Sequence, residues 1–172
     1  MKNWHGIGLA ALCALAAFAA RGEMDLELGM GDVRVKRALE EEGLKYRISD
    51  EGMFILTFEG VDEDRTQLVF VMSSTERLGA GEIREIISVA YRGKPISKTQ
   101  MAELLAENAR FKIGAWEAPA PDVDEDNNRV QAVRFCARVA ADTPPEALRT
   151  FIEHVSDTAD VKEKDWLGSD DF

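Results

Sequence analysis

The sequence predicts an α+β fold in which an antiparallel sheet carries its helices on one face. Helix-type spacing of apolar residues occurs near the start, in the middle and at the end of the chain, and strand-type alternation fills the intervals. Most strand segments are separated by short turns, whereas a parallel sheet needs a long crossover between its strands. The predicted order is therefore α-β-β-β-(β)-α-β-β-α, in which three or four strands precede the second helix.

The composition is that of a globular protein. Of the 172 residues, 45% are hydrophobic and 31% are charged, a balance that excludes collagen-like, low-complexity and multi-pass membrane proteins. Acidic residues outnumber basic ones by 32 to 21, which gives a net charge of −11. Because nucleic acids and anionic lipids are bound by basic surfaces, we expect no nucleic-acid partner and no peripheral membrane binding.

The N-terminal residues 1–19 have the pattern of a signal peptide. One lysine precedes an uncharged apolar run over residues 7–20, and the A-x-A sequence at Ala17–Ala19 is typical of a cleavage site. We expect cleavage near Ala20, with cleavage after Gly22 as an alternative. The run is shorter than the roughly 20 residues that span a bilayer, and an uncleaved anchor is a further alternative. The mature protein is then expected to be periplasmic or secreted, without stable insertion in the membrane.

A single domain is expected over residues 24–168, followed by an acidic tail at residues 169–172. Its first helix begins after Asp32, which can cap the helix, and stops at Gly43, which can adopt the left-handed conformation. The apolar face of this helix consists of Val35, Ala38 and Leu39.

The segments after this helix have strand character. Tyr46–Ile48 and Met53–Glu59 flank a turn and are expected to form a hairpin. Thr66–Ser73 is rich in β-branched and aromatic residues, and apolar residues alternate along Glu82–Arg92 after the turn at 79–81. This spacing predicts three or four antiparallel strands.

The next part of the domain is expected to hold a helix and a hairpin. Ser97 and Gln100 form a capping box at the start of the helix. Lys112–Glu117 and Arg129–Ala140 are expected to pair as strands across the polar loop 118–128. The apolar positions of the helix are Met101, Leu104, Leu105 and Ala109, and those on one face of the second strand are Val133, Phe135, Ala137 and Val139.

The last helix has the clearest local signals. Thr143 is the expected N-cap, a proline follows in the first turn, and Glu146 takes the third position. The apolar stripe of this helix is expected to pack in the core, and it comprises Leu148, Phe151, Ile152, Val155 and Ala159.

The densest acidic segment, residues 122–128, offers oxygen ligands at alternate positions, as the first part of a calcium loop does. Asn127 stands where such a loop needs glycine, and Val133 stands where it needs a bidentate glutamate. A solvated hairpin loop is the better interpretation, and the same holds for the acidic residues 62–64.

Cleavage near Ala20 leaves one cysteine, Cys136, and one histidine, His154. They lie on different predicted elements, so neither a disulfide nor a zinc site of the usual ligands is expected. Cys136 should point away from the core, between Arg134 and Arg138. It is either a small side chain that fills space, which is the commoner case, or a thiol that the two arginines make reactive.

No nucleophile motif or phosphate-binding loop accompanies these residues. We therefore predict no catalytic, metal-binding or cofactor-binding residue, and no cofactor. The aromatic residues around the second and third helices are expected to pack over the sheet rather than to anchor a partner. They are Phe111, Trp116, Trp166 and Phe172.

Two stretches, LLAENARFKIGAWEA at residues 104–118 and RVQAVRFCARVAADTPPEALRTFIEHV at residues 129–155, resemble the YbjN family, named as candidate bacterial sensory transduction regulators. The residues that match the family pattern are Asn108, Arg110, Phe111, Gly114, Phe135, Pro145, Leu148, Phe151 and Ile152. The resemblance implies a type III secretion chaperone-like fold, whose order of elements agrees with the one predicted above. It also implies a binding or regulatory module without a known cofactor.

We therefore expect an exported, non-enzymatic module with a binding, regulatory or chaperone-like role and a protein or peptide partner, with a homodimer as a second option. The alternative is a small periplasmic enzyme whose site uses carboxylates such as Glu103, Glu107 and Asp142. A deep cleft with paired carboxylates would favour the enzyme. A shallow apolar groove or an exposed sheet edge would favour the binding module.

Overall fold

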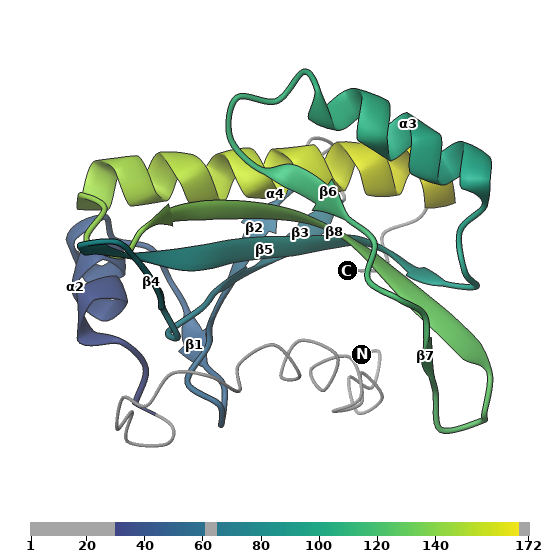
Figure 1. The fold of residues 1–172 in the computed structure, drawn as a ribbon. Coiled ribbons are helices and arrows are strands. Elements are labelled where there is room, and N and C mark those ends of the chain that lie inside the picture. Colours follow the sequence, from purple (N-terminus) through teal and green to yellow (C-terminus); the bar gives the residue numbers. More distant parts are fainter. Residues whose placement is uncertain (1–29, 61–64, 169–172) are drawn as a thin grey trace.

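The computed structural model describes residues 30–60 and 65–168, and Figure 1 shows how their helices and strands are arranged. The predicted signal peptide with its cleavage near Ala20, the acidic residues 62–64 and the tail with Phe172 lie outside the described residues. In chain order the elements are α2 (Val33–Glu41), β1 (Arg47–Ile48), β2 (Phe54–Glu59), β3 (Thr66–Val71), β4 (Glu76–Leu78), β5 (Gly81–Gly93), α3 (Lys98–Asn108), β6 (Ala115–Glu117), β7 (Asp122–Val123), β8 (Arg129–Ala140) and α4 (Pro145–Leu167).

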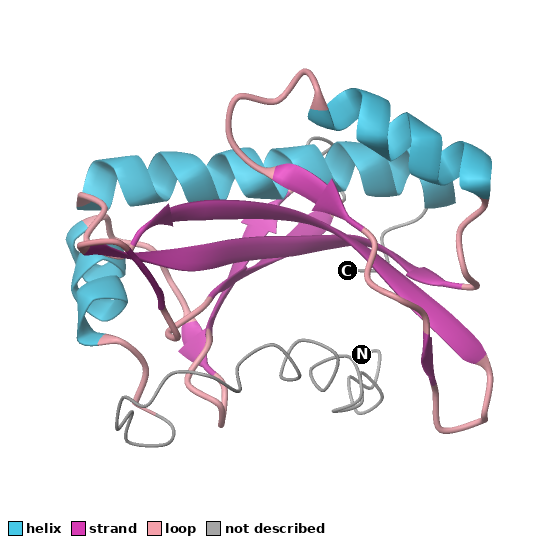
Figure 2. Cartoon of the chain, viewed as in Figure 1, coloured by secondary structure: helices cyan, strands magenta, loops and turns pink. Residues whose placement is uncertain are grey.

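The strands form an antiparallel sheet in the order β1-β2-β3-β5-β8-β6, while β4 pairs with β5 and β7 pairs with β8. The helices gather toward one face of this sheet, where α4 lies along the strands, α2 packs against α4, and α3 packs against β6 (Figure 2). The predicted α+β class with helices on one face is confirmed. The short strands β4 and β7 were not predicted, because three and two residues are too few to show an alternating pattern.

The pairing of β5 with β8 is the longest in the sheet. It runs from Ile83 opposite Ala140 to Gly93 opposite Gln131, with one irregularity after Val89. Side chains alternate between the two faces along each strand, so that Val133, Phe135, Ala137 and Val139 of β8 face the helices, as predicted. The helix-side core also contains Ile86, Ala90, Leu148, Ile152, Val155 and Ala159.

One prediction for α4 was wrong, and a second holds only in part. Its N-cap is Pro144, without a side-chain hydrogen bond, because the hydroxyl of Thr143 donates instead to the backbone carbonyl of Ala140. Phe151 is only half-buried, although its stripe neighbours Leu148 and Ile152 are buried. It packs at the margin of the core, where it also lines a groove beside the end of β8. No helix within residues 30–60 and 65–168 has the length and apolar character needed to cross a membrane.

The N-cap of α2 joins three elements. Asp32, as predicted, accepts a hydrogen bond from the backbone N–H of Arg34, and its own backbone N–H donates to Ser73 after β3. Its carboxylate also accepts from the fully buried side chain of Arg84 on β5, at 2.7 Å. Gly43 has φ of 65° after the end of this helix, which confirms its expected role as the stop.

The capping box of Ser97 and Gln100 at the start of α3 is confirmed. Of the expected apolar positions only Leu104 is buried, and Met101 and Leu105 are exposed. The helix is held at its other end by Asn108, whose amide accepts from the backbone N–H of Trp116 at 2.6 Å and donates to its carbonyl at 3.1 Å. The Asn108 side chain thus binds the two backbone groups that Trp116 presents at the outer edge of β6.

Gly114 turns the chain into β6 with φ of 81°. A Cβ atom there would lie 2.5 Å from the Phe135 ring and 3.2 Å from the backbone oxygen of Cys136. The approach of this turn to β8 therefore requires both the left-handed conformation and the missing side chain of glycine.

We expect Gly114→Ala to lower the free energy of unfolding by about 2–5 kcal/mol, because it combines left-handed strain with a clash in the core. Gly43→Ala is the matched control, since Gly43 has a similar φ of 65° but no atom within 4 Å of the added Cβ. Urea unfolding of both variants measures the difference. Equal losses would contradict the role given to close packing at Gly114.

Asp32 is expected to make the protein acid-sensitive. Burial acts to raise the pKa of Asp32, but the hydrogen bonds from Arg34 and Arg84 outweigh it and lower the pKa to about 2. The charged carboxylate therefore stabilises the fold above about pH 4, and this contribution, about 2 kcal/mol, is lost as the pH falls toward 2. In urea unfolding, the deficit of Asp32→Asn relative to the parent should shrink from about pH 7 to about pH 2.5. Asp50→Asn, at an exposed turn, is the control, and a deficit that does not change with pH would contradict this account.

Candidate binding groove at the edge of β8

The last residues of β8 lie at a free edge of the sheet. Pairing with β6 covers only Arg134 to Cys136 of β8, and the pairing with β7 covers Arg129 and Val130. On this side, no strand of the described chain pairs with Arg138 or Ala140. The free edge exists because the chain turns at Gly114 and enters the sheet only at Ala115, so that β6 is three residues long.

Backbone hydrogen-bonding groups point out from this edge. The N–H of Ala141 donates to the carbonyl of Glu82 at 2.9 Å, so Ala141 and Val139 direct their backbone groups toward β5. Because consecutive residues of a strand alternate in this direction, Arg138 and Ala140 direct theirs away from β5. The Ala140 carbonyl accepts from the Thr143 N–H and hydroxyl, at 3.1 and 2.6 Å. The Arg138 N–H and carbonyl and the Ala140 N–H face the open side.

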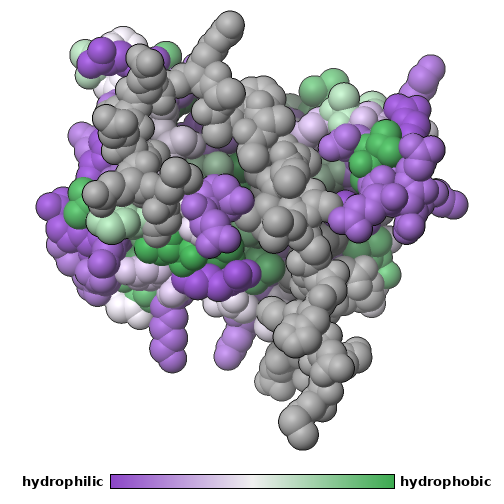
Figure 3. Space-filling model, turned by 90° about the horizontal axis from the view of Figure 1, so that it is seen from below, coloured by the Kyte–Doolittle hydropathy of each residue, from purple (hydrophilic) through white to green (hydrophobic). Residues whose placement is uncertain are grey.

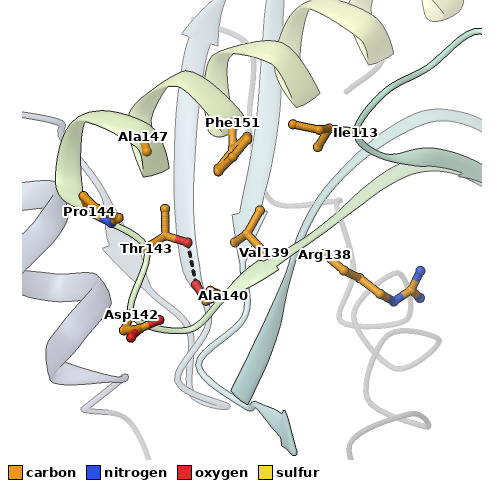
Figure 4. Close-up of a pocket in the computed structure, with 9 residues that line it drawn as sticks. All are labelled: Ile113, Arg138, Val139, Ala140, Asp142, Thr143, Pro144, Ala147 and Phe151. Atoms are coloured by element: carbon orange, nitrogen blue, oxygen red, sulfur yellow. Dashed lines mark hydrogen bonds between the residues drawn. The ribbon is translucent and has the colours of Figure 1, made fainter. Parts of the chain in front are cut away.

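A shallow groove of about 610 Å³ adjoins this edge on the helix side of the sheet (Figure 4). Phe151 of α4 points down toward Val139, and Ile113 closes the groove from the loop before β6. Thr143 and Asp142 make its polar end. The lining consists of Ile113, Arg138, Val139, Ala140, Asp142, Thr143, Pro144, Ala147 and Phe151.

This groove explains why Phe151 is only half-buried. The stripe of α4 continues past the point where β6 ends, so the side chain of Phe151 contacts the core on one side and lines the groove on the other. Ile113 keeps 39% of its surface exposed at the rim. Exposed apolar side chains beside unpaired backbone groups form a surface suited to an extended peptide.

A charged cluster occupies the opposite face of β8. Arg138 binds Glu85 at 2.6 Å and Glu117 at 2.8 Å, and Arg134 binds Glu117 at 2.9 Å. Burial acts to raise the pKa of Glu117, but the hydrogen bond from Arg138 and the charge of Arg134 outweigh it, and the net effect is a lowered pKa. The cluster therefore favours the ionised form of Glu117, and its ion pairs tie β5, β8 and β6 together.

The ligand atoms of Glu85, Glu117 and Cys136 lie within 4.8 Å of one another, close enough to be tested as a metal site. Both carboxylates, however, form ion pairs with Arg138, and Glu117 also forms one with Arg134. Two fixed positive charges at these ligands disfavour a further cation. The donor set does not fit a metal ion.

Cys136 points away from the helix-side core, as predicted, but it is not activated. Burial, followed by the negative charges of Glu117 and Glu85, raises the pKa of Cys136 to about 12 and outweighs the opposing effect of the arginines. The interpretation as a reactive thiol is therefore wrong. Cys136 is a buried, space-filling side chain.

His154 lies half-buried on α4. Its ring packs edge-on against Phe135 and Phe111, with centroids 5.7 and 6.4 Å apart, and its Nε2 lies 3.4 Å from the Ile113 carbonyl. Trp116 also packs on Phe135, and Trp166 packs on Tyr91. The packing interpretation of these aromatic residues is confirmed.

The acidic segment 122–128 forms the turn of the β7–β8 hairpin, which confirms the hairpin interpretation. The carboxylate of Asp124 accepts from the backbone N–H groups of Asp126 and Asn128, and Asn127 has φ of 62°. The hydrogen bond from the Asn128 N–H is the largest of the effects that lower the pKa of Asp124. The acidic cluster is thus organised as a turn by its own backbone.

The three carboxylates considered for an enzyme do not meet at the groove. Asp142 lines the groove, but Glu103 and Glu107 lie on α3 and are absent from the lining. Glu107 accepts from the indole of Trp116 at 2.8 Å and pairs with Lys162 of α4. The groove contains one carboxylate at its polar end and no carboxylate pair among the lining residues.

The free edge of β8 was missed because the strand predicted at Lys112–Glu117 is too long. Residues before Ala115 lie in a turn, and the signal that could have shown this was Gly114 inside the predicted strand. Glycine within a strand pattern often marks a bend or a close backbone approach. With the strand restricted to Ala115–Glu117, a twelve-residue β8 necessarily extends beyond its partner.

Cys136 is expected to react slowly with iodoacetamide in the native protein, because its raised pKa leaves little thiolate. In a chain carrying Cys13→Ser, the rate should keep rising between about pH 7 and pH 10.5 without a plateau, whereas in urea it should match a free cysteine, which levels off above about pH 9.5. Mass spectrometry of the alkylated protein measures both rates. A native rate that levels off within this range would show an ordinary thiol and contradict the assignment.

Comparison with protein-family models and with curated proteins finds no match for this sequence. Among solved structures, the chain is similar to the crystal structure of YbjN from E. coli, described as a candidate transcription regulator. The two share 14% sequence identity, the match covers 76% of this chain and 86% of that one, and the TM-score is 0.43. This likeness concerns the fold, and at this level it does not establish membership of the YbjN family.

Proposed function

We propose that the protein is a non-enzymatic binding module that takes up an extended segment of a partner protein at the free edge of β8. The observation that carries the proposal is the juxtaposition of the open backbone groups of Arg138 and Ala140 with an apolar groove on the same edge. Strand addition satisfies such backbone groups, and pockets beside the edge select side chains.

The geometry sets the chemistry of the partner segment. The open N–H and carbonyl of Arg138 can pair with one residue of an added strand, and the Ala140 N–H can pair two residues further along. Alternate side chains of that strand point to the helix side, where Val139, Phe151 and Ile113 present apolar surface. The segment should therefore be short and extended, with an apolar side chain toward α4.

The wider role follows from the N-terminal pattern. An export signal at residues 1–19 with cleavage near Ala20 would bring this module to the periplasm or the outside of the cell, where it would act in regulation or as a chaperone. A second copy of the chain is another source of an extended segment, which would give a homodimer. The lining of the groove gives no support to the enzyme alternative.

Peptide binding at β8 should protect particular amides. In the free protein the amide hydrogens of Arg138 and Ala140 should exchange rapidly, because no described strand pairs with them. Peptides selected from a random displayed library should slow exchange at these two amides, as measured by NMR. A peptide that binds without protecting either amide would contradict strand addition. If the same two amides become protected at high protein concentration without peptide, the added strand comes from a second copy of the chain.

The substitution Phe151→Ala tests the groove. It should lower the affinity for the selected peptides by about tenfold or more, because burying a side chain of this size contributes about 1.5–3 kcal/mol. Val161→Ala is the matched control, because Val161 is 46% exposed on the same helix and lies outside the groove lining. Isothermal titration calorimetry gives both affinities. Equal affinities for the two variants would exclude the groove as the side-chain pocket.

A further inference from the structure

The free edge of β8 is bounded at both of its ends. On one side β6 begins opposite Cys136, and the turn at Gly114 directly precedes it. On the other side β8 ends at Ala140, where the chain turns toward α4. Between these two turns an added strand has room for about three residues, which would lie opposite residues 138–140.

The Ala140 carbonyl is already occupied. A backbone carbonyl oxygen has two lone pairs, and Thr143 fills both, because its N–H donates at 3.1 Å and its hydroxyl at 2.6 Å. In an antiparallel pair, the partner residue opposite Ala140 would direct its own N–H at this carbonyl. A peptide N–H at that position would lose water without gaining an acceptor, which is unfavourable. The partner residue opposite Ala140 should therefore lack an ordinary peptide N–H.

The charge at this end of the groove sets the direction of the partner strand. Asp142 is exposed and lines the groove two residues beyond Ala140. Among residues 30–60 and 65–168, no ion pair or hydrogen bond involves its carboxylate, whereas Arg138, the other charged residue of the lining, is paired with two glutamates. A strand antiparallel to β8 brings its N-terminal end to this carboxylate, and a parallel strand brings its C-terminal end. The antiparallel direction is favoured, because a negative charge attracts an ammonium group and repels a carboxylate.

We infer that the groove receives the free N-terminus of a partner chain, with its α-ammonium group beside Asp142. The inference rests on the proposed strand addition and specifies which segment is added. The first residue of a chain carries an ammonium group in place of a peptide N–H, and this group is positively charged at neutral pH. It therefore needs no acceptor at the Ala140 carbonyl, and it supplies the charge that Asp142 lacks. Capture of a terminal amine is an established mode of peptide recognition.

The three residues of this N-terminus meet different surfaces. The first lies opposite Ala140 and accepts from its N–H, and the third lies opposite Arg138 and exchanges two hydrogen bonds with it. The second lies opposite Val139 and points to the helix side, where Phe151 and Ile113 present apolar surface. The side chains of the first and third point to the other face of the sheet, where Figure 3 shows hydrophilic side chains beside hydrophobic ones. An apolar second residue between two polar ones is the expected pattern.

Blocking the peptide N-terminus tests the inference. A peptide selected from a random library displayed with free N-termini is synthesised in three forms: with its free amine, with an N-acetyl group, and with two glycines added before its first residue. Isothermal titration calorimetry should give affinities about tenfold or more lower for the last two forms. Each of them brings a peptide N–H to the occupied Ala140 carbonyl and removes the positive charge from Asp142. Amidation of the peptide C-terminus should leave the affinity unchanged.

Two variants of the protein separate the two causes. Asp142→Asn should lower the affinity for the free amine by about tenfold and leave that for the acetylated form unchanged. Glu146→Gln is the matched control, because Glu146 is exposed in the first turn of α4 but lies outside the groove lining, and it should alter neither affinity. Thr143→Ala frees one lone pair of the Ala140 carbonyl, and it should raise the affinity for the acetylated form several-fold relative to the free amine.

Hydrogen exchange at the amides of Arg138 and Ala140 distinguishes failure of this inference from failure of the proposed function. If the free and acetylated forms bind equally and both protect these amides, strand addition stands and the capture of an N-terminus is overturned. If an acetylated peptide with proline as its first residue binds as tightly as the free amine, the missing N–H decides binding, and the role given to Asp142 is overturned. If no form protects either amide, the proposed function fails and this inference fails with it.

Discussion

The antiparallel pairing of β5 with β8 determines most of the remaining structure. Once Ile86 lies opposite Ala137, these side chains face α4, and the next pair, Ile87 and Cys136, must face the other way. The same register aligns Glu85 with Arg138, which allows the arginine to reach Glu117 on β6. One register therefore fixes both the core and the charged cluster, and a slip by one residue would exchange the two faces.

Local signals in the sequence were sufficient where a side chain acts on its own element. The cap at Asp32, the box of Ser97 with Gln100 and the alternation along β8 depend on neighbours a few residues away, and each was predicted correctly. The order of helices and strands and the antiparallel class followed from these signals. The resemblance to the YbjN family agreed with that order, and the likeness found among solved structures concerns the fold alone.

Prediction from the sequence failed where the environment of a side chain depends on a segment far away in the chain. Thr143 has the right position to cap α4, but its hydroxyl donates a hydrogen bond to the Ala140 carbonyl at the end of β8. Phe151 has the spacing of a core residue, yet its burial depends on how far β6 extends along β8. Neither outcome is encoded in the periodicity of α4. The groove could not be predicted for the same reason, since it exists only between three elements that a long-range pairing brings together.

The side-chain amide of Asn108 has a consequence for association of the protein. By occupying the outer edge of Trp116, it prevents β6 from acting as a template for another strand, although β6 is an outer strand of the sheet. At this side of the sheet, among the described strands, the unpaired end of β8 is short, and fibril-forming segments need about six or seven consecutive residues in stacked register. This side of the sheet can thus present main-chain groups for recognition through a stretch that is too short to propagate a fibre.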